Sequence, residues 1–312
     1  MDAAIEVDGL VKAYGPVRAV DGVSFRVAPG EVFAILGPNG AGKTTTVEIL
    51  EGHRKADAGR VRVLGMDPAS DGRAYRERIG IVLQSGAIER ELTPLEALRS
   101  WRLAYPSPRD PDEVLALVGL ADKRDARVGT LSGGQQRRLD LALGLIGDPE
   151  LVFMDEPTTG FDPAARREAW RLVERLADLG KTILLTTHYL DEAQHLADRV
   201  AVIVRGTVVA IGEPSEIGAE RTRMTRIGFE LPAGVEVSDL PVEVRARASA
   251  SGGTVTIETR HPTEMVNVVT GWALGRGAQL EGLTVARPSL EEVYLEIVAE
   301  REAEERAEED RS

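Results

Sequence analysis

The stretch from Val32 to Leu50 reads VFAILGPNGAGKTTTVEIL and contains a strand pattern, a glycine-rich turn and a helix pattern in succession. The five apolar residues at its start are typical of a buried strand. The turn matches the pattern G-x-x-x-x-G-K-S/T, in which glycines let backbone N–H groups face phosphate oxygens. The helix N-terminus adds about half a positive charge, and the lysine adds a full one. The stretch therefore predicts a phosphate-binding loop.

The residues predicted to hold the nucleotide in this loop and its helix are Gly37, Pro38, Asn39, Gly40, Ala41, Gly42, Lys43, Thr44 and Thr45. Thr44 also offers its hydroxyl to Mg²⁺, a cation that prefers oxygen ligands. A chance glycine-rich turn is the alternative, and the four fixed positions arise by accident in roughly one chain in a hundred of this length. The Asn-Lys-x-Asp signature of guanine recognition is absent from the sequence.

A second signal is an apolar run, Leu151 to Met154, that ends in two adjacent carboxylates. The tip of a parallel strand is where a side chain can reach a phosphate site, so we expect Asp155 to orient Mg²⁺. Side chains alternate along a strand, so Glu156 is free for another task, and we assign it as the general base that polarises the attacking water. Such a pair alone is more often a solvated turn or a helix cap. The phosphate loop upstream favours the catalytic interpretation.

A third glycine-rich turn, Leu131 to Gln135 (LSGGQ), opens a helix pattern and predicts another helix N-terminus that can bind an anion. An ordinary helix cap is the alternative. The gap of 111 positions between Thr44 and Asp155 leaves room for a helical insert at about residues 85–145.

The segments Gly37 to Thr44, Leu131 to Gln135 and Leu151 to Glu156, in this order, are similar to the three defining motifs of ABC ATPases. The resemblance covers about residues 3–215 and implies ATP and Mg²⁺ as cofactors. It also implies a head-to-tail homodimer that sandwiches ATP. Ser132, Gly134 and Gln135 of one copy would then face the γ-phosphate held by the other.

The same resemblance implies four further site residues. Tyr14 corresponds to the aromatic that stacks on adenine, and Gln84 to the glutamine that links Mg²⁺ and the attacking water to the transporter. His188 corresponds to the switch histidine and Asp162 to a contact between subunits, although Phe161 stands where the family usually has leucine. The alternatives are a core aromatic for Tyr14, a polar strand end for Gln84 and a satisfied cap for His188.

Short apolar runs alternate with helix patterns over residues 1–215, which predicts an α/β fold of the P-loop NTPase type with a parallel-sheet core. The runs Ile5–Leu10, Val23–Val27 and Val61–Val63 have no helix between successive strands and predict an added antiparallel sheet. The run VAVIVRGTVVAIG predicts a hairpin that turns at Arg205-Gly206.

Composition changes after Pro214, and residues 216–299 predict a small α+β accessory domain. Its expected strands are Arg226–Leu231, Val242–Arg247, Thr254–Thr259 and Leu280–Val285, with a helix over Thr263–Leu274. A last helix should pack through Leu290, Val293, Tyr294 and Ile297. Residues 300–312 form an acidic run that we expect to be disordered.

Charge and composition limit the partners. The net charge of −13 argues against nucleic acid, which requires clustered lysine and arginine. The absence of cysteine fits a reducing compartment, and the N-terminus lacks the basic and apolar regions of a signal peptide. No apolar run approaches the roughly 20 residues that span a bilayer. These features predict a cytoplasmic chain that does not span a membrane. The resemblance to ABC ATPases implies a peripheral position at the cytoplasmic face of the cell membrane and a separate permease as partner.

Two stretches, RRLDLALGL and Pro288 to Tyr294 (PSLEEVY), are similar to the daunorubicin-resistance subgroup of exporter ATPases. This resemblance implies a permease of the ABC-2 type and export of a drug, antibiotic or lipid-like substrate. A capped helix without any partner explains the second stretch equally simply. A non-transport ABC ATPase and an importer ATPase are the competing functions. The apolar residues Ile88, Leu92 and Leu95 lie among charges and predict either a docking groove for the permease or internal packing.

Overall fold

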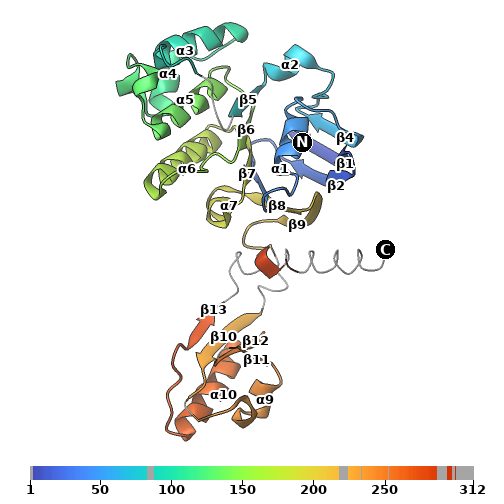
Figure 1. The fold of residues 1–312 in the computed structure, drawn as a ribbon, viewed down its shortest axis with the longest axis vertical. Helices are drawn as coiled ribbons and strands as arrows, with labels where there is room; N and C mark the ends of the chain where they lie inside the picture. Colours follow the sequence, from blue (N-terminus) through green and yellow to red (C-terminus); the bar gives the residue numbers. More distant parts are fainter. Residues whose placement is uncertain are drawn as a thin grey trace. The chain divides into compact units, whose positions relative to one another are not determined.

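The computed structural model describes residues 3–82, 88–217, 224–232, 234–251, 253–286, 294–296 and 299. The chain forms two compact units, Met1–Pro214 and Ser215–Ser312, which are described separately (Figure 1). Within the described residues, no helix combines the length and the apolar character needed to cross a membrane.

The first unit is built on a six-stranded sheet with the order β5-β6-β7-β3-β8-β9. Its strands are β3 (Val32–Leu36), β5 (Ile79–Val82), β6 (Leu151–Asp155), β7 (Thr182–Thr187), β8 (Arg199–Val204) and β9 (Thr207–Gly212). All pair in parallel except β9, which forms the predicted hairpin with β8. The central strands β3 and β7 are buried along their whole length, as expected for a parallel sheet covered on both faces. The predicted parallel-sheet core is confirmed, and β5 is a strand that the sequence pattern did not reveal.

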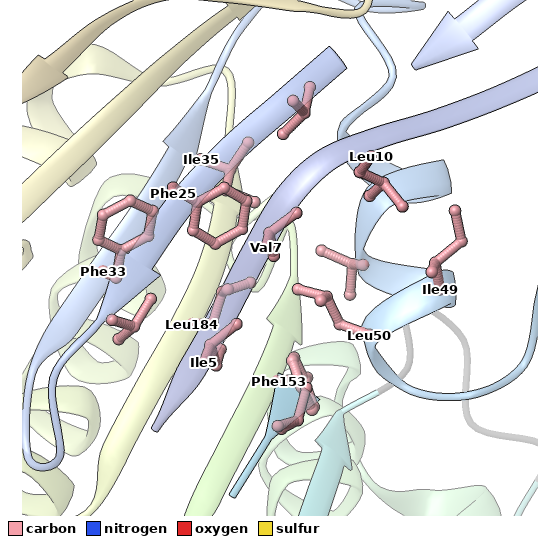
Figure 2. Packing of buried hydrophobic residues seen from close by; sticks show 14 of the residues in the cluster. Ile5, Val7, Leu10, Phe25, Phe33, Ile35, Ile49, Leu50, Phe153 and Leu184 are labelled. Carbon is pink, nitrogen blue, oxygen red and sulfur yellow. The ribbon is translucent and has the colours of Figure 1, made fainter. Parts of the chain in front are cut away.

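A second, antiparallel sheet has the order β2-β1-β4, with β1 (Ile5–Tyr14), β2 (Val17–Val27) and β4 (Ala58–Val63). It confirms the antiparallel addition predicted from three isolated apolar runs. Its inner face packs against the core sheet, where the rings of Phe25 and Phe33 stack with centroids 5.2 Å apart (Figure 2). This shared core fixes the β1–β2 hairpin against the start of α1 (Lys43–Leu50).

Helices fill the rest of the first unit. They are α2 (Gly72–Arg76), α3 (Pro94–Trp101), α4 (Pro111–Leu117), α5 (Gly133–Leu145), α6 (Pro163–Asp178) and α7 (Leu190–Leu196), with short 3-10 turns η1 (Arg102–Ala104), η2 (Ala121–Lys123) and η3 (Val128–Thr130). The start of α3 is set by Pro94 and by a reciprocal cap between Thr93 and Glu96. The helices α3 to α5 pack together as the predicted helical insert.

The second unit is a four-stranded antiparallel sheet with a helix packed on it. Its elements are β10 (Thr225–Glu230), η4 (Val237–Asp239), α9 (Val242–Arg245), β11 (Ala248–Ser251), β12 (Thr254–Thr259), α10 (Pro262–Gly275) and β13 (Thr284–Ala286), and its strand order is β11-β12-β10-β13. Ile227 and Phe229 of β10 pack against Met265 and Val269 of α10. The unit is therefore α+β, with its own core.

The strand predicted over Val242–Arg247 is wrong. The segment forms the one-turn helix α9, in which the N–H groups of Val244 and Arg245 donate to the carbonyl of Pro241. The alternating pattern V-E-V-R suggested a strand, but a proline just before a turn also favours a helix start. The strand that pairs with β12 is β11, which begins at Ala248. The last predicted helix is described only at Tyr294–Glu296 and residue 299, and the acidic run 300–312 lies outside the described residues.

Candidate functional site

The phosphate loop follows β3 and is packed so tightly that glycine is required at two of its positions. A Cβ on Gly37 would lie 2.2 Å from the carbonyl oxygen of Ile203. Gly42 has φ +98°, and a Cβ there would lie 2.1 Å from the carbonyl oxygen of Ala19. Only glycine combines a positive φ with such a close approach of two backbones. Helix α1 begins directly after Gly42, so its free N–H groups point into the loop.

Lys43 lies at the centre of the loop. Its Nζ donates to the carbonyls of Gly37 (2.8 Å) and Pro38 (3.1 Å) and lies 3.5 Å from Oε1 of Glu156. The side chain is only 5% exposed, and burial lowers its pKa, although Glu156 and Asp155 oppose this shift. The loop therefore holds a cation beside an exposed helix N-terminus, which is the arrangement that phosphate groups require.

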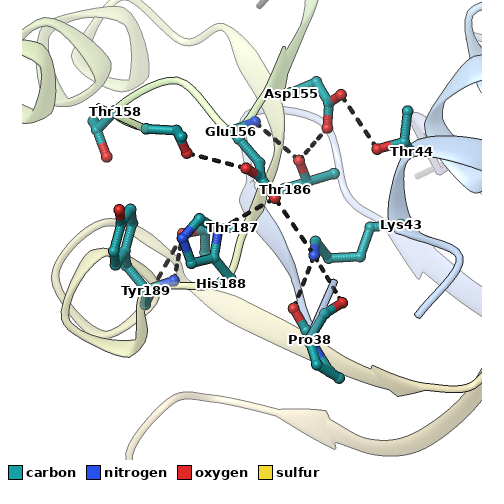
Figure 3. A network of polar contacts seen from close by, with 12 residues as sticks. Pro38, Lys43, Thr44, Asp155, Glu156, Thr158, Thr186, Thr187, His188 and Tyr189 are labelled. Carbon is teal, nitrogen blue, oxygen red and sulfur yellow. Dashed lines mark hydrogen bonds and ion pairs between the residues drawn. The ribbon is translucent and has the colours of Figure 1, made fainter. Parts of the chain in front are cut away.

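Thr44 and Asp155 meet although 111 residues separate them in the chain. The Oγ1 of Thr44 lies 3.4 Å from Oδ2 of Asp155, which occupies the last position of β6 (Figure 3). The hydroxyl of Thr186, on β7, donates to the other carboxylate oxygen of Asp155. A hydroxyl and a carboxylate oxygen side by side are ligands that Mg²⁺ accepts.

Glu156 follows β6 directly and adopts φ +46°, a left-handed conformation that is uncommon outside glycine. Its N–H donates to Oγ1 of Thr186 (3.0 Å), and its Oε2 accepts from Thr159 (3.0 Å). Its Oε1 lies 3.2 Å from Nδ1 of His188 (Figure 3). The turn thus directs the carboxylate toward both Lys43 and the histidine, which alternation along a strand did not predict.

The electrostatic surroundings keep Glu156 charged. Burial alone raises its pKa, but hydrogen bonds from Thr159 and His188 and the charge of Lys43 together bring the pKa below its usual value. A carboxylate that is ionised at neutral pH and hydrogen-bonded to a histidine can accept a proton from water.

Tyr14 ends β1 on the hairpin that packs against the loop. It is 41% exposed, so it is not a core aromatic. The guanidinium carbon of Arg54 lies 5.2 Å from the ring centroid, and Nζ of Lys12 lies 5.8 Å from it. An exposed ring stacked with cations is able to stack on a base. Gln84 lies outside the described residues.

The LSGGQ segment forms the N-terminus of α5. Ser132 caps the helix by accepting from the N–H of Gln135, and Oε1 of Gln135 accepts from the N–H of Ser132. A Cβ on Gly134 would meet no atom within 4 Å, so the space over this helix start is open. A cleft of about 710 Å³ is lined by Gly133, Gly134 and the segment from Thr159 to Asp162.

Asp162 has a role within its own chain that sequence reasoning missed. Its Oδ1 accepts from the N–H groups of Ala164 (2.8 Å) and Ala165 (2.9 Å), so it caps α6. The signal was present, because Pro163 directly after an aspartate is typical of a helix start. Thr186 was missed too, and its only signal was a threonine at the polar end of an apolar strand.

Comparisons with known proteins identify the families and relatives that this chain resembles. Residues 20–159 match the family described as ABC transporter, and residues 225–289 match a family described as the C-terminal domain of ABC transporter domain-containing protein-like sequences. The daunorubicin resistance ATP-binding protein DrrA3 of Streptomyces coeruleorubidus is 40% identical over 96% of this chain and 97% of the relative. The Nod factor export ATP-binding protein I of Paraburkholderia xenovorans is 42% identical over 81% of this chain and 85% of the relative.

Among solved structures, a similar fold occurs in a dimeric ATP-binding cassette in a post-hydrolysis state bound to ADP and phosphate. The TM-score is 0.61 at 25% identity, and the alignment covers 67% of this chain and 98% of the cassette.

Proposed function

Because the chain belongs to the ABC transporter family, as an ATP-binding subunit and ATPase, we propose that it drives export through a separate permease of the ABC-2 type. Cassettes of this family dimerise and work with a transmembrane permease. The observation that supports export is the similarity to daunorubicin resistance and Nod factor export subunits, which extends through both units of the chain. The proposed cargo is a drug, antibiotic or lipid-like molecule.

In the proposed mechanism, the loop from Gly37 to Gly42 and Lys43 bind the phosphates of ATP. Thr44 and Asp155 would hold Mg²⁺, which neutralises charge on the phosphate oxygens when it is bound. Glu156 accepts the proton of the attacking water, and His188, 3.2 Å away, keeps the carboxylate oriented and ionised. Tyr14 stacks on the adenine, and Gln84 links the attacking water to the transporter.

The substitution Glu156→Gln tests whether Glu156 is the general base. The amide keeps the shape of the side chain but cannot accept the proton, so we expect ATP binding to persist and turnover to fall by about two to four orders of magnitude. Glu150→Gln is the matched control, because Glu150 precedes the same strand and forms a surface ion pair with Arg78. Turnover close to that of the unaltered protein in Glu156→Gln would remove Glu156 from this role.

The second half of each site is proposed to come from another copy of the chain. Ser132, Gly134 and Gln135 surround an open helix N-terminus that would face the γ-phosphate held by the partner, and Asp162 lies in the same cleft. Capping of α6 uses Oδ1 of Asp162, so its contribution to a subunit contact would be made by the rest of the side chain. At low protein concentration, a rate of ATP hydrolysis proportional to the square of the protein concentration would support this arrangement.

A cavity of about 540 Å³ in the first unit is the proposed docking groove for an apolar segment of the permease. Its lining comes from β5, α3 and α5 and includes Ile88, Leu92 and Trp101. Leu95 is 5% exposed and belongs to the packing of the insert, not to the groove. We expect Ile88→Glu to abolish co-purification with the permease while ATP binding remains, whereas Leu103→Glu, at an 83% exposed position outside the lining, leaves both intact.

We further propose that residues 216–299 form an accessory domain that supports assembly at the cytoplasmic face of the membrane. The matched family over residues 225–289 and the separate core of this unit support the assignment. Co-expression with the permease tests export against the importer and non-transport alternatives, because only an exporter lowers the cargo content of intact cells.

A further inference from the structure

A buried carboxylate lies next to the proposed site and has no part in the mechanism above. Glu192, in α7, is 0% exposed. Its Oε1 accepts from Oγ1 of Thr158 (2.8 Å) and from Nε1 of Trp170 (3.2 Å). Burial raises its pKa, although hydrogen bonds from Thr187, Thr158 and Trp170 oppose the shift. A carboxyl group is costly to bury unless hydrogen bonds compensate, and Thr158 and Trp170 supply two of them.

The bond to Thr158 joins the two loops that carry the reacting side chains. Thr158 stands two residues after Glu156, and Glu192 stands four residues after His188. Thr158 is 1% exposed and its hydroxyl donates to Glu192, whereas the hydroxyl of its neighbour Thr159 donates to Glu156. The turn after β6 is therefore held by two hydrogen bonds, one to Glu192 and one to Glu156.

Side-chain contacts must hold this turn in place because its backbone conformation is unfavourable. Glu156 at φ +46° occupies a sparsely populated conformation, which persists only when the surrounding contacts determine it. Its N–H donates to Thr186 on β7, its carboxylate accepts from Thr159, and Thr158, two residues further on, is held by its bond to Glu192. Loss of the last contact would free the turn to rotate and would change the distance from Glu156 to His188.

We propose that Glu192 is a positioning residue that holds the Glu156 turn and the His188 loop in the relative positions that hydrolysis requires. The inference rests on the proposed function, in which Glu156 is the base. It predicts an effect on turnover and not on ATP binding, because neither Glu192 nor Thr158 belongs to the phosphate loop. Displacement of a reacting group by about 1 Å costs up to about 100-fold in rate.

Steady-state ATP hydrolysis and nucleotide binding by the full chain test the proposal. In Glu192→Leu and Thr158→Val we expect kcat to fall roughly 10- to 100-fold, while KM and the Kd for ATP change less than about two-fold. Glu192→Gln keeps an acceptor oxygen, and Thr158→Ser keeps the hydroxyl, so both should retain kcat within about three-fold. Trp170→Phe is the control, since it removes a donor from the same oxygen without separating the two loops.

A double mutant separates positioning from general destabilisation. If the two side chains act as one link, Glu192→Leu with Thr158→Val has the kcat of the worse single variant. The proposal is overturned if the two effects multiply, if Glu192→Gln is as impaired as Glu192→Leu, or if KM rises as much as kcat falls. If Glu192→Leu does not fold, the pair Thr158→Val and Thr158→Ser decides the question alone.

The same data distinguish failure of this inference from failure of the proposed function. If the unaltered chain is active, Glu156→Gln is inactive and Thr158→Val has normal turnover, only the positioning role of Glu192 is excluded. If Glu156→Gln retains turnover, Glu156 is not the general base and the proposed function loses its assigned base.

Discussion

Replacing Glu51 with glutamine should remove the contribution of one buried carboxyl to the pH dependence of this protein's stability. Glu51 follows the last turn of α1 and is only 7% exposed, with Oε2 3.2 Å from Nδ1 of His53. Burial, reinforced by the negative charges of Asp155 and Glu48, raises its pKa to about 8. At neutral pH the folded protein therefore holds a proton that the unfolded chain releases.

The sign and size of the effect follow from proton linkage. A group that binds protons more tightly in the folded state stabilises it fully below the unfolded pKa, and this contribution is lost as the pH rises toward the folded value. With pKa values of 4.5 unfolded and about 8 folded, the free energy of unfolding loses on the order of 3 kcal/mol between pH 5 and pH 8 through this one carboxyl. Glutamine does not titrate, so it removes that loss.

Urea unfolding followed by circular dichroism, without nucleotide and with EDTA, measures the difference. The free energy of unfolding of Glu51→Gln minus that of the unaltered chain should become more positive by about 3 kcal/mol from pH 5 to pH 8. Glu113→Gln is the control, because it makes the same chemical change at an exposed position of α4. A difference for Glu51→Gln that does not change between pH 5 and pH 8 would refute the account of this buried carboxyl.

Three further predictions concern the nucleotide site. Gly42→Ala should abolish ATP binding in equilibrium titrations because its Cβ would lie 2.1 Å from the carbonyl oxygen of Ala19, whereas Gly40→Ala, with open space at the Cβ, should meet only backbone strain of about 1–2 kcal/mol. Equal losses in the two variants would contradict the steric argument. Tyr14→Ala should raise the KM for ATP roughly 5- to 100-fold through loss of stacking, and Tyr14→Trp should preserve it; unchanged ATP kinetics in Tyr14→Ala would exclude contact with the base. Asp162→Ala should lower the free energy of unfolding by about 1 kcal/mol through loss of the α6 cap, and Asp162→Asn should retain the cap, as urea titration would show. A turnover defect in Asp162→Asn at unchanged stability would point to a contact between subunits.

Much of the fold could be predicted because its signals are local. The hairpin of β8 and β9 turns at Arg205-Gly206 as expected, and both residues adopt positive φ there. The one-turn helix α9 was misread because four residues with alternating valines fit a strand and a helical turn equally well. The strand β5 was missed because its four residues follow a charged helix without a glycine or proline between them.

The sequence could name candidate residues for the site but not the geometry that joins them. The loop after one strand and the carboxylate at the tip of another predicted that Thr44 and Asp155 would both reach Mg²⁺, and the two side chains lie 3.4 Å apart. No pattern indicated that Glu156 would turn back through a left-handed backbone, because this conformation results from contacts with Thr186 and Thr159. Glu192 resembles any acid in the first turn of a helix, and its burial depends on how α6 and α7 pack together.

The left-handed backbone at Glu156 also bears on how this protein can be improved or damaged by selection. Glycine and asparagine adopt φ +46° more readily than glutamate, so substitution at this position relieves strain. If Glu156 is the base that we propose, a library screened only for thermal tolerance or expression would therefore enrich variants that hydrolyse ATP poorly. Stability and turnover would then be in conflict at this single position, so any engineering scheme for this protein must score both.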